Sequence, residues 1–296
     1  MMAHSSPPDG SRTGGDTRST MENVGAVQRD DSPLITPDRH PEMIVITSWD
    51  DGHPQDMHLA DLLHRHGIEG TFFVPVRNIE GHATLGPAEL RDIAARFEIG
   101  SHTLNHVRLD GLAPADAEAE IRNGKEELES IVGQPVEGFC YPGGRVPHGA
   151  RGMLQRNGIS YARTIESFRL DCGDDPYQIP TTLQVFPHRR LVYAANYVKG
   201  ANYFSRFRCF KTAFLDGSIW SILNKFATHS AGGPRILHIW GHSRELAELD
   251  LWDELDLFFT RLMSCKPTVM SLANLAASIR PSNEPDDAPA NFSATY

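Results

Sequence analysis

Short apolar runs alternate with amphipathic segments along most of the chain. Short runs rich in β-branched and aromatic residues are typical of buried strands, and apolar residues spaced three and four apart indicate helices. We predict strands at 43–48, 71–75, 98–102, 137–142, 159–164, 181–187 and 235–240. We predict helices at 56–67, 86–97, 113–133, 148–158, 213–230 and 251–265, and residues 268–279 pass from a strand into a helix.

This alternation of strands and helices is typical of an α/β protein with a parallel sheet. The number of strand–helix units favours a distorted (β/α) barrel of about seven strands over an open sheet. In such folds the functional side chains gather where strands end and loops begin. Titratable residues at strand ends are therefore the first candidates for a site.

The two ends of the chain differ from the rest in composition. Residues 1–40 are rich in Ser, Pro, Gly, Asp and Arg, and residues 281–296 have the same character, which is typical of disordered segments. We therefore predict a single domain, residues 41–280, between two disordered tails. The N-terminal segment has no apolar signal region and no stretch of about 18 apolar residues occurs, so we expect no membrane span and a cytoplasmic location.

The overall composition narrows the choice of partners. An apolar content of 40% over 296 residues can build one sizeable core. The net charge of −10 disfavours a nucleic-acid partner, because binding phosphates needs a basic face. The cysteines lack C-x-x-C spacing, so we expect free thiols in place of disulfides or zinc ligands: Cys140, Cys172, Cys209 and Cys265.

Polar side chains follow two of the predicted strands. Asp50 and Asp51 end the first strand in "SWDDG", and His102 and His106 follow the third in "SHTLNH". Two imidazoles and one carboxylate form a three-ligand set with open positions, which is typical of a catalytic metal. The second carboxylate would then be available as a general base. Two surface histidines, and an Asx turn or helix N-cap at the aspartates, are the alternatives.

Five segments occur in an order that resembles the polysaccharide deacetylase family: "SWDDG", "TFFVP", "EIGSHTLNH", "GFCYPGG" and "ILHIWGHS". The resemblance covers roughly residues 43–275. Members of this family, which carry the NodB homology domain, are carbohydrate esterases that remove N-acetyl groups from sugars. The resemblance implies a distorted (β/α) barrel with one divalent metal, with zinc as the first candidate. It also implies a hydrolase of non-peptide carbon–nitrogen bonds that releases acetate from an N-acetylated amino sugar or glycan intermediate.

The matching motifs imply roles for individual residues. By this resemblance Asp50 is the catalytic base, and Asp51, His102 and His106 bind the metal. His238, in the late strand, is the general acid that protonates the departing amine.

The late strand offers more than one candidate histidine. Alternation along the strand places His238 on a face that can point into the barrel, although a histidine packed in the core is the alternative. His242, four residues further on, is a rival that could line the substrate cleft or cap the following helix. Trp240 could stack on a sugar ring, or it could belong to the core as most large aromatic residues of short strands do.

The third motif departs from the family pattern. Cys140 stands where the family usually carries the arginine that holds the catalytic aspartate. Arg163, at the end of a neighbouring strand, is our first candidate to replace it, and Arg145 is the second; two ordinary surface arginines are the alternative. Gly143 lets the main chain approach a ligand, so its N–H could donate to an oxyanion or could belong to a plain turn. Tyr141 could line the pocket or simply pack.

Three functions are compatible with these residues. The first is a metal-dependent N-deacetylase of an acetylated amino sugar. The second is an amidohydrolase that acts on a small non-sugar amide or a cyclic ureide, although the histidine pair would be idle in a metal-free enzyme of that kind. The third is a catalytically silent carbohydrate-binding relative, which only the missing arginine supports.

Overall fold

The computed structural model describes residues 43–228 and 235–279, which lie within one compact unit of the chain, residues 39–296. The predicted tails, residues 1–40 and 281–296, lie outside the described residues, so their predicted disorder stays a prediction. Within the described residues no helix is long and apolar enough to cross a membrane. All four cysteines are free, as we predicted.

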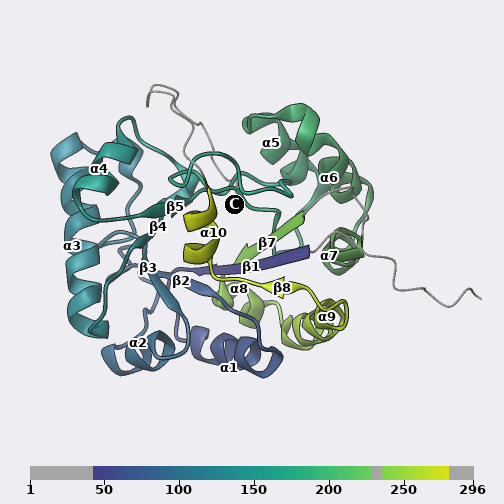
Figure 1. Ribbon diagram of the computed structural model, residues 1–296, viewed down its shortest axis with the longest axis horizontal. Helices are drawn as coiled ribbons and strands as arrows, with labels where there is room; N and C mark the ends of the chain where they lie inside the picture. The colour runs from purple at the N-terminus through teal and green to yellow at the C-terminus, as the bar shows by residue number, and fades with distance from the viewer. Residues whose placement is uncertain (1–42, 229–234, 280–296) are drawn as a thin grey trace, which may run out of the picture. The chain divides into compact units, whose positions relative to one another are not determined.

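Parallel strands form a curled sheet at the centre of the unit (Figure 1). In spatial order they are β5 (Tyr161–Arg163), β4 (Gly138–Cys140), β3 (Glu98–Ser101), β2 (Thr71–Val74), β1 (Met43–Asp50), β7 (Arg235–Gly241) and β6 (Leu183–Gln184). A short strand, β8 (Thr268–Val269), pairs with β1 beside Ile44 and Val45. The parallel curled sheet confirms the predicted α/β class and is consistent with a (β/α) barrel.

Residues 176–182 connect β5 to β7 on the remaining side. The Thr164 N–H donates to the Ile179 carbonyl at 2.9 Å, and the Thr182 N–H donates to the His238 carbonyl at 2.7 Å. Main-chain hydrogen bonds therefore continue across the gap between β5 and β6. This brings the carboxyl ends of β1, β3, β4, β5 and β7 around one opening.

Helices surround the sheet in Figure 1. They are α1 (Asp56–His66), α2 (Pro87–Ala94), α3 (Pro114–Val132), α4 (Ala150–Arg156), α5 (Arg190–Lys199), α6 (Tyr203–Leu215), α7 (Ile219–Thr228), α8 (Ser243–Glu248), α9 (Trp252–Ser264) and α10 (Leu272–Ser278). Leu59 and Leu63 of α1 pack with Trp49 and Phe72 in the main core. A second core forms where α10 joins Ile46, Phe73 and Tyr161 of the strands. Burial of these apolar faces holds the strand ends in place.

Two of the predicted elements are wrong in extent. The predicted helix 213–230 is broken after Leu215, because the Asp216 side chain accepts hydrogen bonds from the Ser218 N–H at 3.3 Å and the Ser221 hydroxyl at 2.7 Å. Such local side-chain bonds compete with helix continuation. The predicted strand 181–187 is reduced to the two residues of β6. Helices α5 and α8, and most of α6, were not predicted.

Gly124 lets α3 approach the loop that carries the two candidate metal-binding histidines. A Cβ at this position would lie 2.7 Å from both the carbonyl carbon of Thr103 and the amide nitrogen of Leu104. These are main-chain atoms, which cannot rotate away as a flexible side chain can. The absence of a side chain at Gly124 therefore fixes where this loop lies.

We expect Gly124→Ala to lower the free energy of unfolding by about 1–3 kcal/mol, as overpacking of a filled core does. Urea denaturation measures this change. Gly152→Ala on α4 is the matched control, since the nearest atom to its added Cβ is the flexible end of Arg156 at 3.2 Å. That variant should be neutral or up to about 1 kcal/mol more stable. Equal effects of the two substitutions would contradict the proposed contact.

Candidate active site

A cavity of about 380 Å³ opens at the carboxyl ends of the strands. Its lining residues are Asp50, Asp51, Glu80, His102, His106, Arg108, Tyr141, Pro142, Gly143, Arg145, Ile165, Trp240, His242, Arg244 and Glu245. Most of the residues that the sequence singled out therefore meet in one place. Arg163 reaches it by its contact with Asp50, and His238 does not line it.

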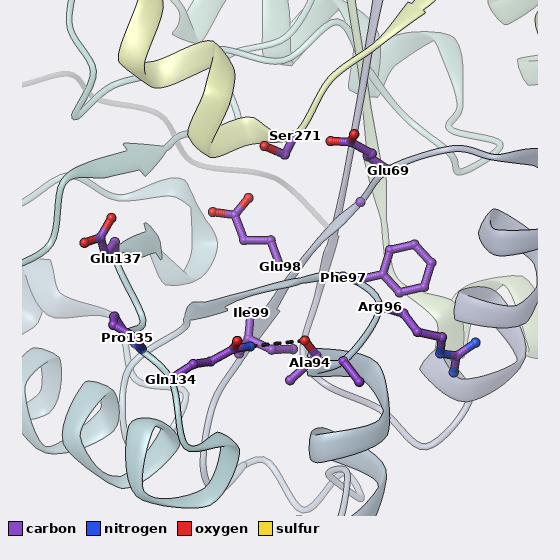
Figure 2. A pocket seen from close by; sticks show the side chains of 12 residues that line it. Glu69, Ala94, Arg96, Phe97, Glu98, Ile99, Gln134, Pro135, Glu137 and Ser271 are labelled. Carbon is purple, nitrogen blue, oxygen red and sulfur yellow. Dashed lines mark hydrogen bonds between the residues drawn. The ribbon is translucent and has the colours of Figure 1, made fainter.

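A larger cavity, of about 640 Å³, lies at the opposite ends of the strands (Figure 2). It contains none of the predicted site residues. Its half-buried carboxylate, Glu98, accepts hydrogen bonds from the Tyr161 hydroxyl at 2.5 Å and the Thr71 hydroxyl at 2.7 Å. Burial raises the pKa of Glu98. These bonds connect the amino ends of three strands, so Glu98 has a structural role there.

The main chain directs the two adjacent aspartates to different partners. Asp50 is the last residue of β1, and Asp51 adopts a φ of 76°. Thr103 and His106, in the loop after β3, also have positive φ values, of 69° and 57°. Residues other than glycine rarely adopt this left-handed conformation, and such strain concentrates at functional sites. Two of these residues, Asp51 and His106, line this cavity.

Asp50 forms a buried ion pair with Arg163. Nη2 of Arg163 contacts both carboxylate oxygens of Asp50 and lies 3.0 Å from Sγ of Cys140. Cys140 and Arg163 are paired in register on β4 and β5, so the guanidinium enters beside Cys140 from the next strand. A buried carboxylate needs such a partner. The contact that we expected of Arg163 is present, whereas Arg145 lies in the cavity wall.

Asp51, His102 and His106 bring three donor atoms together. Oδ1 of Asp51 lies 3.1 Å from Nε2 of His106 and 3.7 Å from Nε2 of His102, and all three donor atoms lie within 4.8 Å of one another. Nδ1 of His102 is 2.8 Å from the Cys140 carbonyl oxygen. This carbonyl can only accept a hydrogen bond, so the proton is on Nδ1 and the Nε2 lone pair faces Asp51. Metal-binding histidines are oriented in this way.

The charges of these three groups suit a cation. Burial lowers the pKa of His102 to about 4, so it is neutral, as a metal ligand must be. Burial alone would raise the pKa of Asp51, but the charges of His242, His106 and His102 hold it far below its usual range. Burial would lower the pKa of His106, but its hydrogen bond to Asp51 raises it, so this ring gives up its proton when a metal binds. An ionised carboxylate beside two imidazoles is a donor set that fits a divalent metal such as zinc.

His238 is packed in the core below the cavity. Its Nε2 lies 2.9 Å from the Ser48 hydroxyl and its Nδ1 lies 2.9 Å from the Pro180 carbonyl oxygen. Burial, and then the charge of Arg163, lowers the pKa of His238 to about 3. Both ring nitrogens therefore have partners inside the barrel, and the one proton of the neutral ring, on Nδ1, is donated to the Pro180 carbonyl.

His242, just beyond the end of β7, lines the cavity. Its Nδ1 lies 2.8 Å from a carboxylate oxygen of Glu245, and its Nε2 lies 3.9 Å from Oδ2 of Asp51. Burial would lower the pKa of His242, but the charges of Asp51 and Glu245 raise it to about 9. His242 is therefore a protonated imidazole at neutral pH and faces the cavity.

The other predicted site residues form the wall of the cavity. The Tyr141 hydroxyl donates to the Tyr177 carbonyl at 3.1 Å, and Gly143 has a φ of 63° in the short turn that follows β4. The ring of Trp240 packs 4.8 Å from the Arg163 guanidinium carbon. Glu245 was not predicted from the sequence. It follows His242 by three residues in the first turn of a helix, and this spacing could have indicated that the two side chains interact.

Comparisons with known proteins agree with this geometry. Residues 37–162 match the family model described as polysaccharide deacetylase. The peptidoglycan-N-acetylglucosamine deacetylase of Bacillus cereus is 31% identical over 110 residues, which cover 36% of this chain and 48% of that protein. YxkH of Bacillus subtilis, which carries the polysaccharide deacetylase name, is 26% identical over 138 residues, covering 46% and 50%.

A solved structure shows the same fold over more of the chain. The chitin deacetylase from the fungus Colletotrichum lindemuthianum superposes with a TM-score of 0.51 at 17% identity, covering 85% of this chain and 92% of that one. Residues 37–162 thus match the model of the polysaccharide deacetylase family, whose members are hydrolases that act on carbon–nitrogen bonds other than peptide bonds. The chain spans about half the length of the curated relatives it matches.

We expect the purified chain to hold about one divalent ion, which elemental mass spectrometry counts. His102→Ala removes one of the three donors, so that variant should lose the ion. His64→Ala, on the exposed side of α1, is the matched control and should keep it. Full metal content in His102→Ala would contradict the three-donor site.

Proposed function

We propose that the chain is a metal-dependent N-deacetylase that hydrolyses the acetamide of an N-acetylated amino sugar or glycan intermediate and releases acetate. One observation supports this above all others. A paired buried carboxylate, a three-donor cation site and a protonated histidine meet in a single cavity. Amide hydrolysis needs a base for water, a stabiliser for the developing oxyanion and an acid for the leaving amine, and these groups match the three needs.

The cation site and Asp50 act on the water and the carbonyl. A divalent ion held by Asp51 and the two histidines, with zinc as the first candidate, would polarise the acetyl carbonyl and lower the pKa of a water molecule. Asp50 accepts the proton that the water gives up as its oxygen bonds to the carbonyl carbon. Arg163 holds Asp50 in a fixed orientation for this step. The Gly143 N–H, in the cavity wall, is our candidate donor to the oxyanion.

We assign the general acid to His242 in place of His238. His242 faces the cavity and carries a proton, whereas His238 is neutral and enclosed by core partners. As the carbon–nitrogen bond breaks, His242 gives its proton to the amine nitrogen, and acetate and the free amine are the products. Glu245 orients the imidazole and stabilises its charge.

The names of the relatives suggest the substrate class. One is a deacetylase of peptidoglycan N-acetylglucosamine and another deacetylates chitin, so we propose a glycan that contains N-acetylglucosamine or a similar amino sugar. The missing family arginine was the only support for a catalytically silent relative, and Arg163 now occupies the corresponding place beside Asp50. The cytoplasmic location stays a prediction from the sequence.

The base role of Asp50 is tested by Asp50→Asn. We expect acetate release from a chitin oligosaccharide to fall by about a hundredfold or more, as loss of a general base does, while the bound metal is retained. Asp92→Asn, on the exposed face of α2, is the matched control and should keep full activity. Undiminished acetate release from Asp50→Asn would show that another group takes the proton.

The pairing of His242 with Glu245 predicts a change in pH dependence. His242 must be protonated to act as an acid, so the rate should fall as pH rises through its pKa. Glu245→Gln removes a negative charge and thereby lowers the pKa of His242, which should move the alkaline limb of kcat/KM to lower pH. Glu248→Gln, which alters an exposed pair with Arg244, should leave that limb in place. An alkaline limb unmoved in Glu245→Gln would contradict the assignment of His242.

A further inference from the structure

The hairpin of α5 and α6 differs in charge from the rest of the chain. Between residues 176 and 215 there are six Lys or Arg residues and no Asp or Glu, although the whole chain has a net charge of −10. Five of the six cations are on the surface: Arg189, Arg190, Lys199, Arg208 and Lys211. The hairpin therefore presents a positive surface on an acidic protein.

The same hairpin exposes large apolar side chains. Phe204 is 99% exposed, Leu191 is 79% exposed, Val198 is 66% exposed and Leu215 is 62% exposed. Single exposed apolar residues are normal, but a group of this size on two adjacent helices marks an interaction surface. We call these four residues, with Phe207, Arg189, Arg190 and Lys211, the hairpin surface.

On α6 the apolar and cationic residues share one side of the helix. Phe204, Phe207, Lys211 and Leu215 are spaced three and four apart, so they follow one face. Leu191 and Val198 of α5 are seven residues apart and also share a face. Exposed apolar side chains with cations beside them can bind an anionic lipid surface, because the apolar groups are buried among the headgroups and the cations pair with the lipid phosphates.

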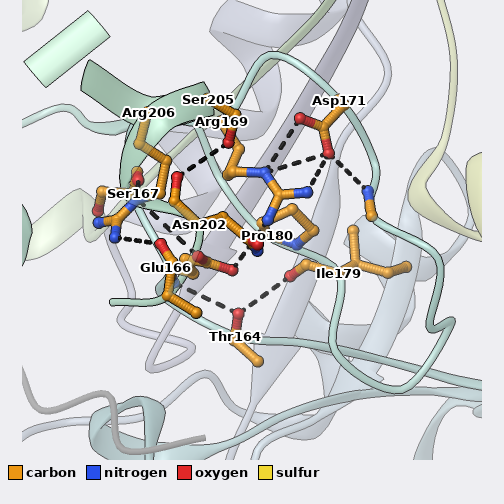
Figure 3. A network of polar contacts seen from close by, with 12 residues as sticks. Thr164, Glu166, Ser167, Arg169, Asp171, Ile179, Pro180, Asn202, Ser205 and Arg206 are labelled. Carbon is orange, nitrogen blue, oxygen red and sulfur yellow. Dashed lines mark hydrogen bonds and ion pairs between the residues drawn. The ribbon is translucent and has the colours of Figure 1, made fainter. Parts of the chain in front are cut away.

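The hairpin is attached to the loop that follows β5, and its two helices are packed against each other, so this surface is a fixed feature. Arg206 of α6 is fully buried, and it donates to the main-chain carbonyl of Ser167 at 2.8 Å (Figure 3). It also donates to the main-chain carbonyl of Asn196 at 2.9 Å. The ring of Tyr197 on α5 stacks on Phe210 of α6 at a centroid distance of 4.2 Å. The inner faces of both helices are thus packed, and the outer faces are presented together.

We propose that the hairpin surface binds an anionic lipid bilayer. The apolar side chains would enter the headgroup region, and the arginines and lysine would bind the lipid phosphates. A nucleic acid is disfavoured as the partner for two reasons. The exposed Phe, Leu and Val side chains would add no binding energy on a phosphate backbone, and the protein as a whole is negatively charged. The negative charge elsewhere would also orient the protein so that only this face approaches the bilayer.

The hairpin continues directly from the rim of the candidate active site. His188, two residues before α5, lies 2.8 Å from the Gln184 side-chain oxygen, and the Gln184 amide donates to Glu245 at 3.1 Å. Docking would therefore fix the part of the chain that borders His242 relative to the bilayer. The membrane proposal itself does not depend on the deacetylase activity.

The test is flotation of the full chain with lipid vesicles. Binding is expected to mixed phosphatidylcholine–phosphatidylglycerol vesicles and not to pure phosphatidylcholine, and it should weaken as salt is added. The double variants Leu191→Ser with Phe204→Ser, and Arg190→Glu with Lys211→Glu, should each weaken binding by more than about tenfold. Leu257→Ser and Arg261→Glu, both exposed on α9, are the matched controls and should bind as the wild type does.

Three results would overturn the proposal: no binding to the anionic vesicles, equal binding by the hairpin variants, or capture by a soluble polyanion such as heparin in place of vesicles. Melting temperature and acetate release from a soluble chitin oligosaccharide should be unchanged in the hairpin variants. These two readouts separate a loss of docking from a loss of folding. A chain without deacetylase activity that still binds anionic vesicles would refute the proposed function and leave this one standing.

Discussion

Asp50 and Asp51 lie side by side at the end of β1, and two carboxylates this close repel each other unless each has its own positive partner. The left-handed turn at Asp51 separates their side chains. Asp50 then pairs with Arg163 inside the barrel, while Asp51 faces the imidazoles of the cavity. The proposed chemistry depends on this division, because it leaves Asp50 available to accept a proton and Asp51 available to bind a cation.

The parallel sheet delivers the partners of both aspartates. β1 is central, and the loops after β3 and β7 bring His102, His106 and His242 to its carboxyl end from either side. The guanidinium of Arg163 arrives from β5, where it is in register with Cys140 of β4. The positive charge beside Asp50 therefore comes from β5, at the register position next to Cys140 of β4.

The fold class, the meeting of Asp51, His102 and His106, and the Arg163 contact could be predicted from the sequence, because the ends of parallel strands converge and motifs record which side chains are at them. The proposal of His242 over His238 as the general acid depends on the structure. Alternation along β7 correctly predicts that His238 points into the barrel. There its ring nitrogens contact Ser48 and Pro180 in the core, whereas the cavity lies beyond the end of the strand. Helices α5 and α6 were missed because their exposed aromatic residues blur the usual apolar stripe.

The most direct test of the account is acetate release by the metal-free chain, before and after zinc is added back. The account predicts that chelation abolishes release from an N-acetylglucosamine oligosaccharide, and that activity returns in proportion to the ion bound, up to about one per chain. The claim that deacetylation depends on a bound metal would be contradicted if the protein kept full activity while elemental analysis found no metal in it. It would also be contradicted by a chain that holds one ion per molecule and releases no acetate from any such oligosaccharide.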